Sequence, residues 1–184
     1  APGANEPHAK SAGTAVQIDP ATDAALRGSI SIIQTDRLSS TEVEVGRQPS
    51  GLAVSPDGAT LYVANSDDDT IELIDTKTQK VKQTLSLTPA QDPGFGQMPT
   101  DLVLSADEKF LYVTCGGGNA VAVVALPELR ITGYIPTGWF PIAVAEEKGT
   151  LFVASSKGLG ARLRFQNRGF AASQGIGTVL FLKP

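Results

Sequence analysis

Most of the side chains in this chain that could bind a ligand lie in or near one long segment close to its C-terminal end. Roughly 20 residues separate the apolar runs Leu151–Ser155 and Gly177–Leu182, and connections of that length are uncommon and often functional. The candidate binding residues are the single tryptophan and the cationic and amide side chains that follow it, namely Trp139, Lys157, Arg162, Arg164, Asn167 and Arg168. Together they could bind an anion, a sugar or a partner chain. Alternatively, the segment packs over the end of the fold or against a neighbouring domain.

Residues with catalytic or metal-binding chemistry are scarce. His8 is the single histidine, which leaves a Ser-His-Asp relay or a zinc site without enough partners. Cys115 is the single cysteine, and its apolar strand pattern favours a small buried side chain over a reactive thiol. Asp67–Asp69 lacks the alternating ligands, the glycine and the final glutamate of an EF-hand loop. We predict no catalytic residue, no metal site and no cofactor in this chain, but undetected carboxylate pairs leave open whether it is an enzyme.

The composition is that of a turn-rich β protein. Of the 184 residues 41% are hydrophobic, and 19 glycines and 12 prolines supply turns. The formal net charge is −4 and no long run carries one sign, which argues against nucleic acid as a partner. No stretch approaches the roughly 18 apolar residues of a membrane span. The start at Ala1 lacks the basic and apolar regions of a signal peptide.

An internal repeat indicates the architecture. Three segments share a proline, a short apolar run, a turn and a second apolar run with an aromatic residue. The prolines are Pro49, Pro99 and Pro141, spaced by 50 and 42 residues, and the aromatic residues are Tyr62, Tyr112 and Phe152. A period of roughly 40–50 residues is that of a propeller blade and is too long for a leucine-rich or ankyrin repeat.

Each complete repeat predicts four short strands. In the first repeat, Ser55–Gly58 has the proline, aspartate and glycine that a β-turn favours. We expect strands at Ser50–Ser55, Thr60–Asn65, Thr70–Asp75 and Val81–Leu87, and again at Thr100–Ser105, Phe110–Cys115, Ala120–Ala125 and Arg130–Ile135. Helical periodicity is absent almost everywhere, with one expected helical turn at Ala21–Leu26. The predicted fold class is all-β, with β-propeller blades of four antiparallel strands.

The number of strands is too small for a closed propeller. Gly28–Gln34 and Thr41–Val45 look like the last two strands of an earlier blade, and Gly177–Leu182 looks like a third strand without a fourth. We divide the chain into an N-terminal extension, partly irregular (1–27), and a partial propeller (28–184), made of a blade remnant (28–46), two blades (49–88 and 99–136) and an incomplete blade (140–184). About three to four blades result, whereas propellers normally close with four to eight. The expected partners are the remaining propeller blades, from a longer polypeptide, a second chain or a homodimer mate.

The repeat also resembles a known family. Leu61-Tyr62-Val63-Ala64-Asn65, preceded by Ser55-Pro56-Asp57-Gly58, is similar to the YVTN-type β-propeller repeat, although Cys115 and Ser155 replace the usual asparagine. Pro136–Pro141, Leu151–Ala154 and Lys157–Gly160 resemble the propeller portion of bacterial propeller/phosphoesterase proteins. This resemblance implies a phosphoesterase domain of the alkaline-phosphatase superfamily beyond Pro184, and that domain would carry the metal site.

These observations favour a non-catalytic propeller module that binds a ligand or a protein, or acts as a scaffold, as part of a larger exported protein. The alternative is the propeller portion of a phosphoesterase whose catalytic domain lies outside this chain. A redox propeller is disfavoured, because the haem-attachment motif CxxCH and its histidine ligands are missing. Scarcity of cysteine fits a bacterial periplasmic or extracellular location.

Overall fold

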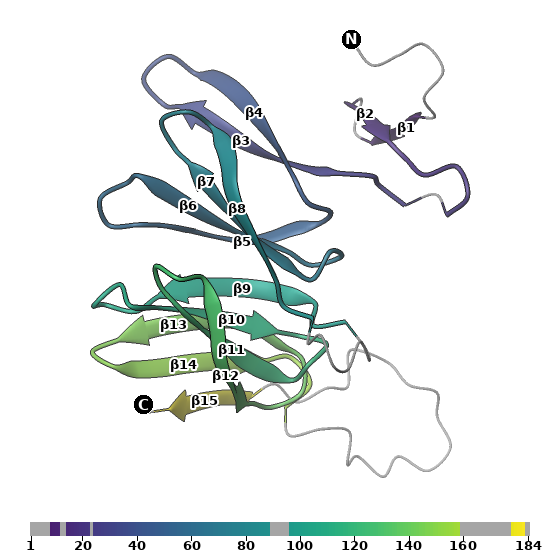
Figure 1. Cartoon of the computed structure of the whole chain (residues 1–184). Coiled ribbons are helices and arrows are strands. Elements are labelled where there is room, and N and C mark those ends of the chain that lie inside the picture. The colour runs from purple at the N-terminus through teal and green to yellow at the C-terminus, as the bar shows by residue number, and fades with distance from the viewer. Residues whose placement is uncertain (1–7, 12–13, 23, 89–95, 159–177, 183–184) are drawn as a thin grey trace, which may run out of the picture.

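The computed structural model describes residues 8–11, 14–22, 24–88, 96–158 and 178–182. Every regular element in these ranges is a β-strand, and all the strand pairs are antiparallel (Figure 1). The predicted fold class is confirmed, since the chain is all-β and its four-stranded sheets are those of a partial β-propeller.

Two complete four-stranded sheets form the middle of the chain. The first full blade consists, in spatial order, of β5 (Pro49–Val54), β6 (Thr60–Asn65), β7 (Thr70–Asp75) and β8 (Lys80–Ser86). The second full blade consists of β9 (Pro99–Leu104), β10 (Phe110–Cys115), β11 (Ala120–Ala125) and β12 (Arg130–Pro136). Each bound agrees with the expected strand to within one residue, because proline, glycine and aspartate mark the turns so clearly.

Shorter sheets flank the two full blades. The half-blade contains β3 (Gly28–Gln34) and β4 (Ser39–Val45), and the C-terminal sheet contains β13 (Pro141–Glu147), β14 (Thr150–Ser155) and β15 (Thr178–Leu182). A separate hairpin of β1 (His8–Ser11) and β2 (Thr14–Gln17) precedes them, in a segment for which the sequence pattern predicts no strand.

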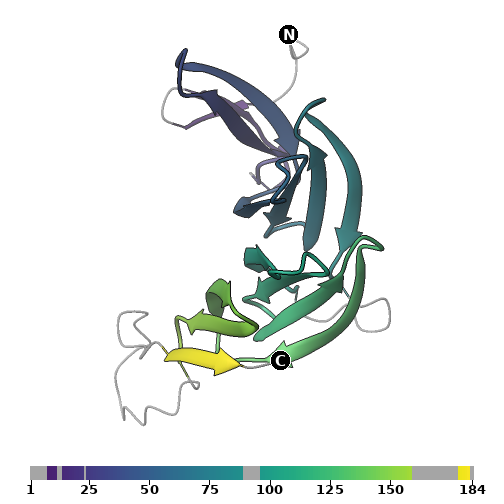
Figure 2. The same ribbon diagram turned by 90° about the vertical axis from the view of Figure 1, so that its left-hand side faces the viewer.

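The sheets follow one another along an open arc, with their inner strands side by side (Figure 2). Strand β9 lies between β5 and β13, and these three inner strands belong to three different sheets. Apolar side chains fill the space between neighbouring sheets. The cluster between the two full blades includes Tyr62, Ala64, Ile71, Leu102, Leu111 and Val113. Sheets that are apolar on both faces must pack face to face, which explains the stack of wedges.

The turn between the two inner strands of a full blade is held by an aspartate. Asp57 Oδ1 accepts hydrogen bonds from Ser55 Oγ (2.5 Å) and from the Ala59 N–H (2.9 Å), as the sequence predicts. Asp107 Oδ1 accepts a hydrogen bond from the hydroxyl of Ser105 in the same way. This bond, and after it the hydrogen bonds from Lys109, lower the pKa of Asp107 to about 2.

The second of these turns contains a residue in an unfavourable backbone conformation. Glu108 has a φ of 58° at the position where the first turn has Gly58, with a φ of 71°. A side chain in the left-handed region costs about 1–2 kcal/mol, and glycine avoids this cost. We therefore expect Glu108→Gly to raise the free energy of unfolding by about 0.5–1 kcal/mol after the entropic cost of glycine is subtracted. Urea unfolding followed by circular dichroism measures the change.

The control for this substitution is Glu128→Gly. Glu128 is exposed in another β-turn, between β11 and β12, and its φ is not positive. Glycine at position 128 should therefore be neutral or destabilising, because it only adds freedom to the unfolded chain. A loss of stability in both variants would contradict the strain assigned to Glu108.

The expected helical turn at Ala21–Leu26 was wrong for the residues that can be described there. Instead, the chain bends back on itself, and Ala25 forms a β-bridge with Ile18. Asp19 Oδ1 accepts the Ala21 N–H over 2.8 Å, and the Asp19 N–H donates to Ala24 O over 2.9 Å. An aspartate that bonds to the backbone two residues further on offers the chain an alternative to a helix. Across the described ranges, no helix has the length and apolar character needed to cross a bilayer.

Candidate functional site

The same backbone arrangement recurs three times at one end of the sheets, which we call the loop end. The residue before each inner strand has a positive φ, 53° at Gln48, 48° at Met98 and 57° at Phe140. The carbonyl oxygens of these residues accept backbone N–H groups, in each case over 2.9 Å, from Ser66, Gly116 and Ser156. The loop end is therefore a repeated and rigid backbone frame.

Side chains tie the loop end of each full blade to the next sheet. Asp69 Oδ1 accepts the Met98 N–H over 2.6 Å, and Asn119 Oδ1 accepts the Phe140 N–H over 2.8 Å. Asp69 and Asn119 both have a φ of 53° and both directly precede the third strand of their blade. The equivalent residue of each blade thus positions the backbone of the following one.

A second set of bonds links the inner strands. Ser50 Oγ donates to Pro99 O over 2.8 Å, and Thr100 Oγ1 donates to Pro141 O, also over 2.8 Å. Each hydroxyl belongs to the residue after the repeat proline, and each acceptor is the repeat proline of the next sheet. These bonds fix the spacing of the inner strands where they begin.

Two of the six candidate binding residues come together on this frame. The Lys157 N–H donates to Trp139 O over 3.0 Å, and the Trp139 N–H donates to Gly158 O over 2.6 Å. The Trp139 residue is 51% exposed, so a large aromatic side chain faces solvent at the loop end. Lys157 Nζ lies 4.7 Å from the centre of the Phe140 ring, a cation–π distance. The ammonium group contacts no carboxylate within the described ranges.

The other four candidates cannot be placed. Arg162, Arg164, Asn167 and Arg168 lie outside the described residues, within 159–177. Whether they approach Trp139 stays a prediction.

The position equivalent to Trp139 in the first full blade is Arg47, and its charge is already paired. Arg47 Nε donates to Asp68 Oδ1 over 2.6 Å, and the Arg47 backbone N–H donates to Asp68 Oδ2 over 2.6 Å. The hydrogen bond and charge of Asp68 raise the pKa of Arg47. The two loop segments share a backbone but present different chemistry. The first carries an ion pair, whereas the second carries an exposed indole and a lysine that lies over the Phe140 ring and pairs with no carboxylate among the described residues.

Sequence reasoning missed the positions that are equivalent to Trp139. They are Arg47 and Gln97, and each follows a glycine and stands two residues before the repeat proline. The signal that could have found them is the shared spacing Gly-x-x-Pro, which occurs at Gly46, Gly96 and Gly138.

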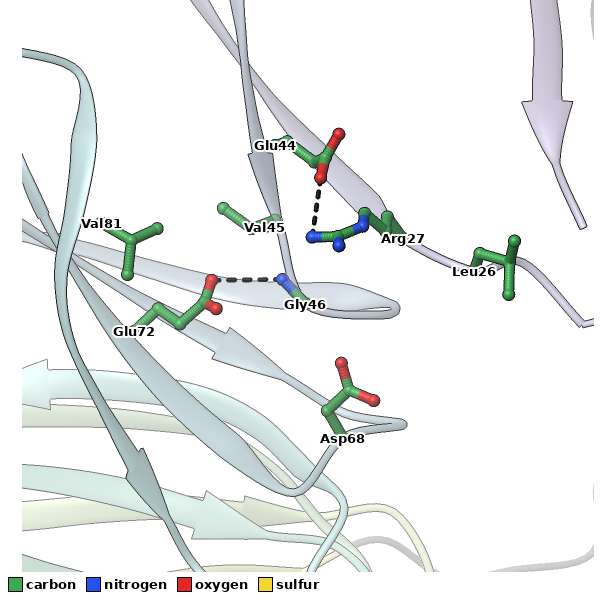
Figure 3. A pocket seen from close by; sticks show the side chains of 8 residues that line it. All are labelled: Leu26, Arg27, Glu44, Val45, Gly46, Asp68, Glu72 and Val81. Carbon is green, nitrogen blue, oxygen red and sulfur yellow. Dashed lines mark hydrogen bonds and ion pairs between the residues drawn. The ribbon is translucent and has the colours of Figure 1, made fainter. Parts of the chain in front are cut away.

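An open pocket lies between the half-blade and the first full blade (Figure 3). Its volume is about 690 Å³, and its lining consists of Leu26, Arg27, Glu44, Val45, Gly46, Asp68, Glu72 and Val81. Arg27 Nη1 pairs with Glu44 Oε1 over 2.7 Å, and Glu72 Oε2 accepts the Gly46 N–H over 3.1 Å. Its charged groups are thus mostly paired with the protein. The described part of the chain contains no group of three His, Cys, Asp or Glu side chains that could hold a metal ion.

Cys115 is a buried structural residue, as the sequence predicts. It is fully buried in the cluster between the two full blades, and burial raises the pKa of its thiol to about 12. At neutral pH the side chain is therefore an uncharged thiol and no nucleophile.

Comparison with known proteins extends these observations. The family model described as "Lactonase, 7-bladed beta-propeller" matches residues 17–130. None of the curated proteins compared with the chain matches it.

Solved structures share the arrangement of sheets. The hydrazine synthase of Kuenenia stuttgartiensis is 28% identical, with a TM-score of 0.61 over 70% of this chain and 36% of that chain. A luciferin-regenerating enzyme is 17% identical, with a TM-score of 0.63 over 92% of this chain and 56% of that one. A Bacteroides uniformis protein titled "putative 6-phosphogluconolactonase" is 21% identical, with a TM-score of 0.57 over 77% of this chain and 46% of that one. The chain thus spans between 36% and 56% of these three structures.

Proposed function

Because the chain belongs to the family of lactonase seven-bladed β-propellers, we propose that it is the ligand-binding part of a larger propeller and performs no catalysis by itself. The proposed site is the loop end around Trp139 and Lys157. The proposed ligand is a sugar acid or sugar lactone, a small ring or chain with many hydroxyl groups and a negative or strongly polar end.

The observation that carries this proposal is the contrast between a constant backbone and variable side chains. The frame that holds Gln48, Met98 and Phe140 uses hydrogen bonds of the same kind and length in three repeats. The positions on top of it carry Arg47, Gln97 and Trp139, which differ in size, charge and polarity. Rigid scaffolds that vary their exposed loop residues are typical of binding surfaces.

The chemistry at Trp139 and Lys157 suits the proposed ligand. An exposed indole ring offers a flat apolar surface for the C–H face of a sugar. An ammonium group that has no carboxylate partner among the described residues can pair with a carboxylate or phosphate. The description of the family as lactonases supports a sugar lactone or the sugar acid that its hydrolysis produces.

A fluorescence titration tests the proposed site directly, because Trp139 is the only tryptophan. We expect 6-phosphogluconate to change the emission of the full chain saturably. By calorimetry, Trp139→Ala should weaken binding about 10-fold, the loss of roughly 1.4 kcal/mol of stacking and burial. The matched control is Leu38→Ala, since Leu38 is 85% exposed in the turn between β3 and β4. Unchanged affinity in the Trp139 variant, or equal losses in both variants, would contradict the site.

The family description also favours a second candidate, hydrolysis of a sugar lactone. A measurement of acid release from gluconolactone at constant pH separates the two functions. If the protein only binds the ligand, the lactone should hydrolyse at the spontaneous rate measured in buffer without protein. A faster rate that Trp139→Ala abolishes would support the second candidate.

Three further proposals follow from resemblance and composition rather than from the site. The first is that the repeats belong to the YVTN type. The second is that the complete protein also contains a phosphoesterase domain, and the third is that the protein is exported to a bacterial periplasm or surface. The sequence of the gene after the codon for Pro184 tests the second, and cell fractionation with an antibody to this chain tests the third.

A further inference from the structure

An aromatic ring fixes the place of the Lys157 ammonium group. Lys157 Nζ lies 4.7 Å from the centre of the Phe140 ring, and it pairs with no carboxylate among the described residues. The residue before Lys157 is bonded twice to the same phenylalanine, because Phe140 O accepts the Ser156 N–H over 2.9 Å and the Ser156 hydroxyl over 3.2 Å. The ammonium group and the ring thus belong to two segments whose backbones are joined at this point.

The Phe140 ring is itself supported by the preceding blade. The Phe140 N–H donates to Asn119 Oδ1 over 2.8 Å. A Cβ atom at Gly116 would stand 3.4 Å from Phe140 Cε2, so the ring lies against the backbone of the hairpin tip between β10 and β11. The ring therefore has a fixed position at the loop end, and Lys157 lies over it.

The two full blades lack a cation at the position of Lys157. In the first full blade the equivalent residue is Asp67, whose N–H donates to Arg47 O over 3.4 Å. In the second it is Gly117, whose N–H donates to Gln97 O over 3.0 Å. Of these three equivalent positions, Lys157 alone carries a positive charge. Recognition of a negative charge should therefore be confined to the C-terminal sheet.

The contact with the ring leaves the charge of Lys157 available to a ligand. The face of a phenyl ring attracts a cation but carries no charge that would neutralise it. A carboxylate can form a charge-assisted hydrogen bond to the ammonium group, whereas the carbonyl group of a lactone offers only a dipole. Because the ring already restricts where the ammonium group lies, less side-chain freedom is lost when a ligand binds.

We propose that the site at Trp139 and Lys157 selects the open-chain sugar acid over the uncharged sugar lactone, and that Phe140 is the positioning residue for this selection. The inference rests on the proposed function, which accepts the acid and the lactone alike. A protein with this selectivity retains the product of lactone hydrolysis rather than the lactone.

Three probes of similar size separate the charge of the ligand from its shape. They are gluconate, its neutral amide gluconamide, and the neutral and stable ring analogue gluconolactam. In titrations of the full chain followed by the emission of Trp139, gluconate should bind about 10-fold more tightly than either neutral probe. Lys157→Gln should abolish this preference. The control Lys77→Gln removes an exposed lysine from the turn between β7 and β8 and should leave the preference unchanged.

Variants of Phe140 test the positioning role. Phe140→Leu keeps an apolar side chain but removes the ring, so the preference for gluconate over gluconamide should fall to about 3-fold or less. Phe140→Tyr keeps the ring face and should keep the preference. A residue that only stabilised the fold would instead change the binding of both ligands by the same factor.

NMR of the ligand-free chain gives a second readout. Because a ring current shields the groups above its face, the ε-methylene protons of Lys157 should lie upfield of those of Lys77, and Phe140→Leu should remove the difference. Absence of this shift, equal affinity for gluconate and gluconamide, or a preference that survives Lys157→Gln or Phe140→Leu would overturn the inference while the proposed site stands. Failure of all three probes to bind would overturn the proposed function, and this inference with it.

Discussion

Replacing Leu102 by alanine is expected to lower the free energy of unfolding by about 2–5 kcal/mol. Leu102 is 4% exposed in the cluster between the two full blades, so its truncation leaves a cavity. The backbones of the two sheets prevent this cavity from closing fully. The cost combines lost transfer free energy with lost contacts, as for other buried leucines. Urea unfolding followed by circular dichroism gives the value.

The matched control is Leu52→Ala at the equivalent repeat position. Because Leu52 is 53% exposed, we expect a loss below about 1 kcal/mol. If Leu52 were as buried as Leu102, the two alanine variants should lose the same free energy of unfolding. Similar losses in both variants would therefore contradict the exposure of Leu52 on the side of the half-blade.

Substitution of Gly51 by alanine should separate the first two inner strands and cost about 1–3 kcal/mol. A Cβ atom at position 51 would stand 2.8 Å from Asp101 Cα and 3.3 Å from the Leu102 nitrogen. Both are backbone atoms of β9, so no side-chain rotation relieves the contact. The two blades would have to move apart, and the bond from Ser50 Oγ to Pro99 O would lengthen with them.

The control for this substitution is Gly133→Ala in β12. A Cβ atom there would meet nothing within 4 Å, and the φ of Gly133 is not positive. Alanine should therefore be neutral or stabilise by about 0.4–1 kcal/mol, because it restricts the unfolded chain. Thermal unfolding of both variants tests the pair, and equal melting temperatures would argue against close packing of β5 on β9.

Most strand positions could be predicted because their turns are chemically explicit. Pro56, Asp57 and Gly58 each satisfy one requirement of the turn, and the structure shows the bonds that these residue types imply. The same turn tolerates Glu108 in place of glycine, since tertiary packing outweighs a local cost of that size. Local signals were thus sufficient for the blades.

The candidate site was only partly predictable. Trp139 and Lys157 stood out by type, but their contact depends on a hydrogen bond between segments 18 residues apart, which no spacing in the sequence reveals. The exposure of Leu52 was invisible for a related reason. Its side chain has the same apolar character as Leu102. What distinguishes them is that, among the described residues, the sheet before β5 has two strands and the sheet before β9 has four.

The bend at Asp19 shows where a weak local pattern gives a wrong prediction. Apolar and small residues after Asp19 suggested a helical turn, but a single carboxylate that binds the Ala21 N–H stabilises a different backbone. Short segments of weak periodicity are decided by one hydrogen bond, and such a bond leaves no repeated pattern to detect.

The repeat units stand side by side as separate sheets, and this arrangement determines every contact between the blades. Nuclear Overhauser effects measured by NMR on the full chain test this arrangement most directly. We predict a contact between the Gly51 and Asp101 Hα protons, since their backbones approach face to face, together with cross-strand amide contacts from β5 to β6 only. Amide contacts that continue from β5 to β9 as one ladder, or successive amide contacts of a helix after Pro49 or Pro99, would contradict it.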